Sequence, residues 1–142
     1  MKRKSILPII YFIITFLGCQ NVAKSQTPAV VKSAFEIKYP GEKHSKWEID
    51  SNGNYETHFK VNGIKYRADF SPNGQWIETE TNIKKKDLPE PVKEAIKKNY
   101  GNEDIAEIEK VDSATKGLFY DVEFKQKGKN KDVEYNASGK EL

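Results

Sequence analysis

Two acidic side chains in one short segment are the first candidates for chemistry. Glu78 and Glu80 lie two residues apart in a segment with strand-like alternation, which places both carboxyl groups on one face. Such a pair can act as general acid and base. The neighbours expected from strand pairing are Lys65 and Arg67, whose charges favour ordinary ionised carboxylates. Gly-x-Ser-x-Gly and Cys/His nucleophile motifs are also missing from the sequence. We therefore predict that the protein is not an enzyme.

Metal ligands are sparse in the sequence. Residues 50–54, Asp-Ser-Asn-Gly-Asn, begin like a calcium-binding loop, but Tyr55 stands where that loop needs glycine and Val61 where it needs glutamate. This pattern predicts a plain turn. His44 and His58 have no Cys or second His at ligand spacing, so both are expected to be solvated imidazoles. No metal site and no cofactor are predicted.

Trp76 is the main candidate for contact with a partner. The expected strand register places this large aromatic side chain on a polar sheet face, near His58, Arg67 and Asp69. Tryptophan and arginine are enriched at the energetic centres of protein interfaces. These four residues form the predicted contact site. The alternative interpretation is that Trp76 covers the edge of the sheet or packs under a helix from the neighbouring unit.

The balance of charge argues against nucleic acid as a partner. The chain has 142 residues, with 24 Lys and Arg against 21 Asp and Glu. Lys2, Arg3 and Lys4 precede the first apolar run, and without them 24 − 3 = 21 basic residues balance the 21 acidic ones. Binding to nucleic acid needs a clustered excess of basic charge. The single Cys provides no disulfide framework.

The N-terminus has the pattern of an export signal. Basic residues precede an apolar stretch at 6–17, which is shorter than the roughly 20 residues that span a membrane. Residues 1–18 are therefore predicted to be a signal peptide, with a tether at 19–26. Gly18-Cys19 resembles the bacterial lipobox, so Cys19 is the expected lipidation site, in the periplasm or at the outer membrane. The alternative is cleavage after Ser25, which extends the signal peptide to residue 25 and releases a soluble, secreted protein.

The remaining chain repeats one unit at a spacing of about 61 to 65 residues. Residues 28–39 align with 89–100 through shared Pro, Val-Lys, Ala and Tyr positions, and Gly74 aligns with Gly139. Because the matches keep both residue type and order, they predict an internal duplication. The predicted domain at 27–142 then consists of repeat one at 27–83, a linker at 84–86 and repeat two at 87–142.

Each repeat is predicted to be one helix followed by antiparallel strands. Apolar residues recur at helical spacing in 28–39 and 89–100. The alternating segments 55–61 and 64–70 flank Asn62-Gly63, which predicts a hairpin with a type I′ turn. The two-residue loop pairs residue 61 with 64, 59 with 66, 57 with 68 and 55 with 70.

The other strands are less tightly specified. A strand at 75–80 follows the turn at 71–74; with Phe70 opposite Gln75, Arg67 would face Glu78 and Lys65 would face Glu80. Asp121, Glu123, Asp132 and Glu134 make the corresponding face of the second repeat acidic. Further strands are predicted at 46–50, 105–111, 118–125 and 130–135, and the last strand of repeat two is expected to be short or absent.

Helices on one side of antiparallel strands indicate an α+β fold, with the other sheet face polar and open. The two units contain a set of turn and core motifs: the helix-opening Pro with Val-Lys-x-Ala, Tyr39-Pro40, Trp47, the Asn-Gly hairpin, the turn before Trp76, Asp87-Leu88-Pro89 and Asn136-Ala-Ser-Gly-Lys140. These motifs resemble the PepSY-like or β-lactamase-inhibitor-like family of small exported proteins of Bacteroidetes-type bacteria. The resemblance implies two tandem units, each one helix followed by three or four antiparallel strands, as in β-lactamase inhibitor proteins. No inhibitory residue can be transferred by position.

These observations together predict an exported binding module without catalysis. The expected function is protein-binding or inhibitor-like, through the open antiparallel sheet face, with another envelope protein as the partner. The alternative is an envelope protein that binds or senses a small molecule or ion, which predicts a pocket between the sheet and the helices. A membrane contact is expected only through a lipid on Cys19, and nucleic acid is not expected as a partner.

Overall fold

The computed structural model describes residues 26–142. The predicted signal peptide, Cys19 and the tether up to residue 25 lie outside the described residues. Among the residues that are described, no helix is both long enough and apolar enough to cross a membrane.

The chain forms two helices and one antiparallel sheet, so the predicted α+β fold is confirmed. The sheet has seven strands that pair in sequence order from β1 to β7. A helix opens each half, followed by four strands in the first and three in the second. The elements are α1 (Ala29–Lys38), β1 (His44–Ile49), β2 (Tyr55–Val61), β3 (Ile64–Phe70), β4 (Trp76–Asn82), the 3₁₀ helix η1 (Lys85–Asp87), α2 (Glu90–Tyr100), β5 (Ile105–Ser113), β6 (Gly117–Phe124) and β7 (Lys131–Asn136).

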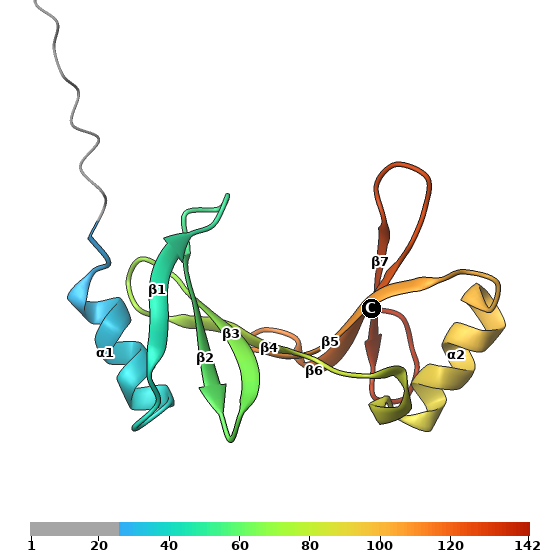
Figure 1. Cartoon of the computed structure of the whole chain (residues 1–142), viewed down its shortest axis with the longest axis horizontal. Helices are drawn as coiled ribbons and strands as arrows, with labels where there is room; N and C mark the ends of the chain where they lie inside the picture. Colours follow the sequence, from blue (N-terminus) through green and yellow to red (C-terminus); the bar gives the residue numbers. More distant parts are fainter. Residues whose placement is uncertain (1–25) are drawn as a thin grey trace, which may run out of the picture.

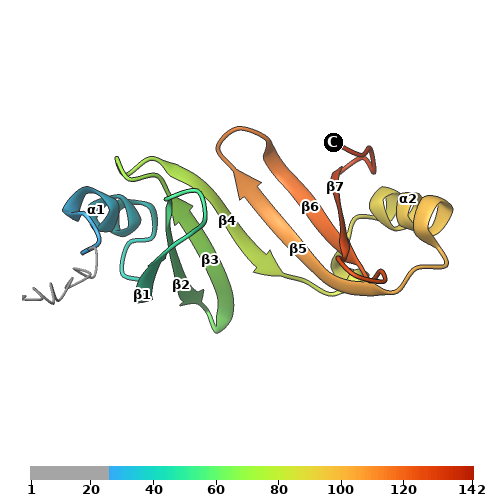
Figure 2. The same ribbon diagram turned by 90° about the horizontal axis from the view of Figure 1, so that it is seen from above.

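Pairing of β4 with β5 joins the two halves into one sheet. Figures 1 and 2 show α1 and α2 at opposite ends of the molecule, with the strands between them. In Figure 1 each helix lies on the outside of the bent sheet, and the helix-free faces of the two halves look toward each other across the bend. We call this helix-free side the open face.

Each half has its own apolar core between its helix and the sheet. Val31 and Phe35 of α1 are fully buried against Phe59 and Phe70 of the hairpin. In the second half Val92 and Ile96 of α2 pack against a similar set from β6 and β7. Burial of one large apolar side chain contributes about 1.5–3 kcal/mol. The second-half set comprises Tyr120, Val122, Phe124, Val133 and Tyr135.

The central hairpin has the predicted register. β2 pairs with β3 from Tyr55↔Phe70 to Val61↔Ile64. Asn62 and Gly63 have φ values of 51° and 82°, as a type I′ turn requires. The apolar members of the hairpin therefore share the helix-bearing face, and its polar members share the open face.

The predicted register of β4 is wrong by two residues. Arg67 pairs with Glu80 and Asp69 pairs with Glu78, whereas Arg67 was expected to face Glu78 and Lys65 to face Glu80. The turn is one residue shorter than expected, because Ser71 already bonds to Gln75 through its backbone N–H. A β-bulge then adds one extra residue between the Phe70↔Trp76 and Asp69↔Glu78 pairs.

Matching turns pack against the two helices. Gly74 has φ +82°, and an added Cβ would lie 2.9 Å from the Val30 oxygen in α1. Gly139 has φ +79°, and an added Cβ would lie 2.4 Å from the Pro91 oxygen in α2. Only glycine satisfies both the backbone conformation and the close approach. These equivalent contacts agree with the duplication inferred from sequence.

Two further features follow the predicted organisation. The 3₁₀ helix η1 overlaps the predicted linker at 84–86. After β7 an isolated bridge joins Tyr135 to Glu141 in place of a full last strand.

Candidate functional site

The strand pairings carry one row of side chains across the open face. His58 on β2 pairs with Arg67 on β3, which pairs with Glu80 on β4. The row continues from Glu80 to Val111 on β5 and then to Phe119 on β6. Because side chains of directly paired residues point to the same side of a sheet, the polar groups of both halves meet on this face.

Arg67 lies among three carboxylates in this row. Its Nε atom is 3.5 Å from Asp69 Oδ2 and 3.9 Å from Glu56 Oε2, and its Nη2 atom contacts Glu80 Oε2. The Arg67 side chain is 35% exposed. One guanidinium therefore serves as the counter-charge for several acidic groups.

Burial makes two of these carboxyl groups unusual. Asp69 and Glu80 are each only 7% exposed. Burial raises the pKa of Glu80 to about 8. The positive charge of Arg67 lowers this pKa, and the neighbouring carboxylates raise it. Burial likewise raises the pKa of Asp69 to about 6. The expectation that Arg67 and Lys65 would hold Glu80 in an ordinary ionised state is wrong, because desolvation is the larger effect.

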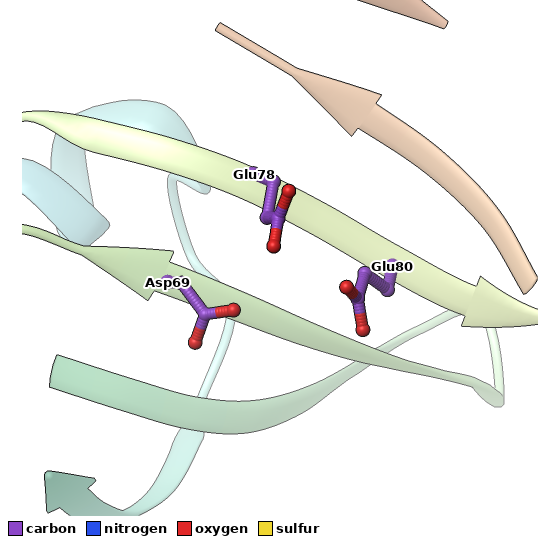
Figure 3. Close-up of side chains that lie close together, drawn as sticks. All are labelled: Asp69, Glu78 and Glu80. Carbon is purple, nitrogen blue, oxygen red and sulfur yellow. The ribbon is translucent and has the colours of Figure 1, made fainter. Parts of the chain in front are cut away.

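Glu78 completes a cluster with these two residues. One carboxylate oxygen from each of Asp69, Glu78 and Glu80 lies within 4.8 Å of the others. Figure 3 shows the three side chains on the same side of β3 and β4, with Asp69 directed toward the two glutamates. The β-bulge that changed the register of β4 is what places Glu78 directly opposite Asp69.

The second half of the open face is strongly acidic, as the alternation of β6 and β7 predicted. A hollow of about 240 Å³ there is lined by five acidic residues and no basic one. Burial, together with Asp132 and Glu134, raises the pKa of Asp121 to about 6. Burial also raises the pKa of Glu109. The lining residues are Glu107, Glu109, Asp121, Glu123 and Asp132.

A groove of about 390 Å³ connects the two halves of the open face. His58 and Arg67 line it from the first half, and Glu107 and Glu109 line it from the second. Sequence reasoning missed these two glutamates as neighbours of Arg67. Local patterns specify pairing within each repeat, whereas this contact depends on the pairing of β4 with β5 across the repeats.

Trp76 does not share a face with the other predicted contact residues. It pairs with Phe70 and packs against the first-half core, while Arg67, His58 and Asp69 lie on the open face. The predicted placement on the polar face is wrong, because the shorter turn inverts the orientation of Trp76. Trp76 instead packs beside a helix, but this helix is α1 of its own repeat and not one from the neighbouring unit, as the alternative interpretation expected.

Polar groups hold Trp76 in this position. Its Nε1 donates a hydrogen bond to Thr79 Oγ1 at 2.9 Å, and the Lys38 ammonium lies 3.4 Å from the centroid of its ring. The Tyr39 hydroxyl also hydrogen-bonds to Thr79. Trp76 thereby fixes the end of α1 against β4.

The weaker sequence candidates behave as expected. Asp50 Oδ1 accepts hydrogen bonds from the backbone N–H groups of Asn52 and Asn54, both at 2.8 Å, which confirms a plain turn. The His58 side chain is 60% exposed, and its Nε2 lies 3.2 Å from Glu56 Oε1. Trp47, one of the motif residues, packs against the first-half core.

Two hollows outside the open-face row have different linings. The larger, about 700 Å³, lies at the sheet edge where β1 begins, and Lys43, Lys60 and Lys65 line it together with Phe59. The smaller, about 260 Å³, lies beside the C-terminal end of α1 and is lined in part by Tyr39.

Comparison with known proteins identifies the fold. The profile described as "Putative beta-lactamase-inhibitor-like, PepSY-like" matches residues 18–62 and 53–140. A DUF2874 family protein from Bacteroides ovatus has 24% identity and a TM-score of 0.72, with 82% of this chain and 85% of that chain covered. A BLIP-like protein from Bacteroides fragilis has 22% identity and a TM-score of 0.70, with 82% and 84% covered.

A third solved structure, a "putative periplasmic" protein from Bacteroides eggerthii, has 18% identity and a TM-score of 0.71, with 82% of this chain and 86% of that chain covered. No curated protein matches the chain. The solved structures share the fold, and the two profile matches together extend over both repeats. The chain therefore belongs to the PepSY-like, β-lactamase-inhibitor-like family.

Proposed function

We propose that this chain is an exported, non-enzymatic module whose open face binds another envelope protein. The single observation that carries the proposal is the concentration of unneutralised carboxylates on an exposed sheet face that no helix covers. The partner is a protein that presents a lysine- or arginine-rich loop. Charge complementarity of this kind accelerates association and selects partners.

The shape of the molecule supports this choice of surface. The open face lies on the inside of the bend, so a convex segment of a partner can contact both halves at once. The acidic hollow on β5 to β7 would receive its basic side chains. Arg67 and His58 on the other side of the groove would contact its acidic or carbonyl groups. The name of the BLIP-like relative is consistent with an inhibitor-like role on such a face.

Absence of catalysis is part of the proposal. Within residues 26–142, the carboxyl groups whose pKa values are raised most are those of Asp69, Glu80 and Asp121. None of the three forms a hydrogen bond with a Ser, Thr or Cys side chain of this range that could act as a nucleophile. The carboxylates are therefore suited to binding. Export rests on the N-terminal pattern and on the description of the Bacteroides eggerthii relative. We assign the membrane link to a lipid on Cys19; secretion after cleavage at Ser25 is the alternative.

The test is capture of partners from envelope extract by the full chain and by charge-reversed variants. Glu107 and Asp132 are exposed on the open face, so the Glu107→Lys/Asp132→Lys variant should fold normally. Juxtaposed like charges cost several kcal/mol at an interface. Capture of the specific partner should fall at least about tenfold, and raised salt should weaken capture by the wild type.

A matched control carries the same change in net charge on the helices. Glu36 on α1 and Glu94 on α2 are both exposed and lie away from the open face. The Glu36→Lys/Glu94→Lys variant should capture the partner as the wild type does. Equal capture by all three proteins, or greater loss with the helix variant, would exclude the open face as the binding surface.

The hollow at the start of β1 supports the alternative function, binding of a small molecule. Lys43, Lys60 and Lys65 line it, and Lys60 and Lys65 are directly paired like charges. Its volume, about 700 Å³, lies in the range of ligand pockets. Glu42 also lies in the lining, but the three lysines leave an excess of positive charge, which suits a small anion with an apolar body. Titration with phenyl phosphate should shift the NMR signals of these lysines; no saturable shift would exclude the alternative.

A further inference from the structure

The cluster of Asp69, Glu78 and Glu80 has more negative charge than its protein neighbours neutralise. Arg67 contacts Oδ2 of Asp69 and Oε2 of Glu80. Three carboxyl groups thus share one guanidinium, and burial and mutual repulsion raise the pKa of Glu80 to about 8 and that of Asp69 to about 6, so part of the cluster holds protons near neutral pH. A divalent cation would replace these protons, because the fully ionised cluster beside Arg67 has a net charge of −2 for the cation to cancel.

The oxygens that Arg67 does not contact are the ones available to a cation. Asp69 Oδ1 is buried and has no hydrogen-bond partner among the described residues. Asp69 is only 7% exposed, and its side chain is directed toward Glu78 and Glu80. Little solvent therefore reaches this oxygen except from the side of the two glutamates. A buried acceptor without a partner is costly, and a bound ion is one of the ways in which proteins satisfy it. Glu78, for its part, makes no ion pair or hydrogen bond among the described side chains.

The geometry points to a divalent cation site, which we propose is held by Asp69, Glu78 and Glu80 on the open face and favours Ca²⁺. The ligand oxygens lie within 4.8 Å of one another, which suits Ca²⁺ with its oxygen distances of about 2.3–2.6 Å. Mg²⁺ holds its oxygens at about 2.0–2.1 Å and demands octahedral geometry, so it would require the three side chains to approach more closely.

Neighbouring elements set the character of this site. Glu56 on β2 adds negative charge and competes with Asp69 for Arg67. On the other side of β4, Glu109 of β5 adds negative charge near Glu80. Water would complete the coordination, since Arg67 contacts two of the six carboxylate oxygens and the remaining four are fewer than the 6–8 oxygens that Ca²⁺ takes. A site with so few protein ligands fits the about 10⁻⁴–10⁻³ M dissociation constants of extracellular calcium modules.

The inference concerns a ligand of the isolated protein and does not depend on the protein partner. It is tested by calorimetric titration of the full chain with CaCl₂, with MgCl₂ and KCl at equal ionic strength as comparisons. We expect one saturable site for Ca²⁺, weaker binding of Mg²⁺ and none of K⁺. Saturation with Ca²⁺ should also shift the NMR signals of Asp69, Glu78 and Glu80.

Variants separate this site from general attraction by the acidic face. Glu78→Gln removes one ligand without breaking an ion pair and should weaken Ca²⁺ binding at least tenfold. Glu123→Gln removes a carboxylate from the acidic hollow on β6 and should leave the affinity unchanged. Equal weakening by both variants, or no saturable heat with Ca²⁺, would overturn the proposal and leave Arg67 as the counter-charge. If Glu78→Gln does not fold, the location of the wild-type NMR shifts decides, and shifts confined to β5–β7 would overturn it.

Discussion

Replacement of Arg67 by Gln should destabilise the protein by leaving buried carboxylates without their counter-charge. Asp69 Oδ2 lies 3.5 Å from Arg67 Nε, Glu56 Oε2 lies 3.9 Å away, and Glu80 contacts the guanidinium. Removing one partner of a fully buried ion pair costs about 3–5 kcal/mol. Arg67 is 35% exposed, so solvent screening reduces the expected loss to about 2 kcal/mol.

Urea denaturation at neutral pH and low salt measures this loss. With a slope of about 2 kcal/mol per molar urea, the midpoint should fall by about 1 M. The matched control is Lys65→Gln, which removes a neighbouring cation of β3 that makes no ion pair among the described residues. It should change the stability by less than about 0.5 kcal/mol.

A double-mutant cycle with Glu80→Gln isolates the pairwise effect. In the Glu80→Gln background, Arg67→Gln should cost clearly less than in the wild type, since the ion pair between Arg67 and Glu80 is already lost. The reasoning is refuted if Arg67→Gln costs the same in both backgrounds, or if it is no more destabilising than Lys65→Gln.

Three further predictions test other parts of the structure. Gly139→Ala should destabilise the protein by about 1 kcal/mol or more beyond Gly63→Ala in urea, because both have positive φ but only at 139 would the new Cβ meet the Pro91 oxygen; equal losses would contradict this contact. For Asp121, a pKa raised from 3.8 to about 6 means that the folded state loses stability as the pH rises from about 4 to 6, so Asp121→Asn should raise the melting temperature more at pH 7.5 than at pH 4; an equal effect at both pH values would count against burial of this carboxyl group. Trp76→Phe should cost about 1 kcal/mol through the lost hydrogen bond to Thr79 yet leave partner capture unchanged; loss of capture without loss of stability would return Trp76 to the binding surface.

The parts of the fold that local chemistry controls could be predicted from the sequence. The Asn62-Gly63 turn leaves only two residues between strands, so it fixed every pair of the central hairpin. Helical spacing likewise identified the buried residues of both helices. The register of β4 could not be predicted in this way, because Ser71-Pro-Asn-Gly74 permits more than one loop length and the β-bulge leaves no clear pattern.

The candidate site was only partly visible in the sequence for the same reason. Arg67, His58 and Asp69 lie on the open face as predicted, because the hairpin register was right. The burial of Asp69 and Glu80 depends on the β4 register and on the pairing of β4 with β5, which joins residues distant in sequence. The predicted face of Trp76 was wrong because the turn before it is one residue shorter than expected. Composition and periodicity contain little information about such long-range pairings.

Site-specific photo-crosslinking in cells of the source bacterium tests the binding surface most directly. A photoreactive residue is placed at Glu123 on the open face or at Glu94 on the exposed side of α2, each in the whole chain. The proposal predicts a protein adduct from position 123, lost when Glu107→Lys/Asp132→Lys is added, and no such adduct from position 94. Adducts from position 94 alone, or an adduct from position 123 that survives the charge reversal, would contradict the assignment of the acidic open face as the binding surface.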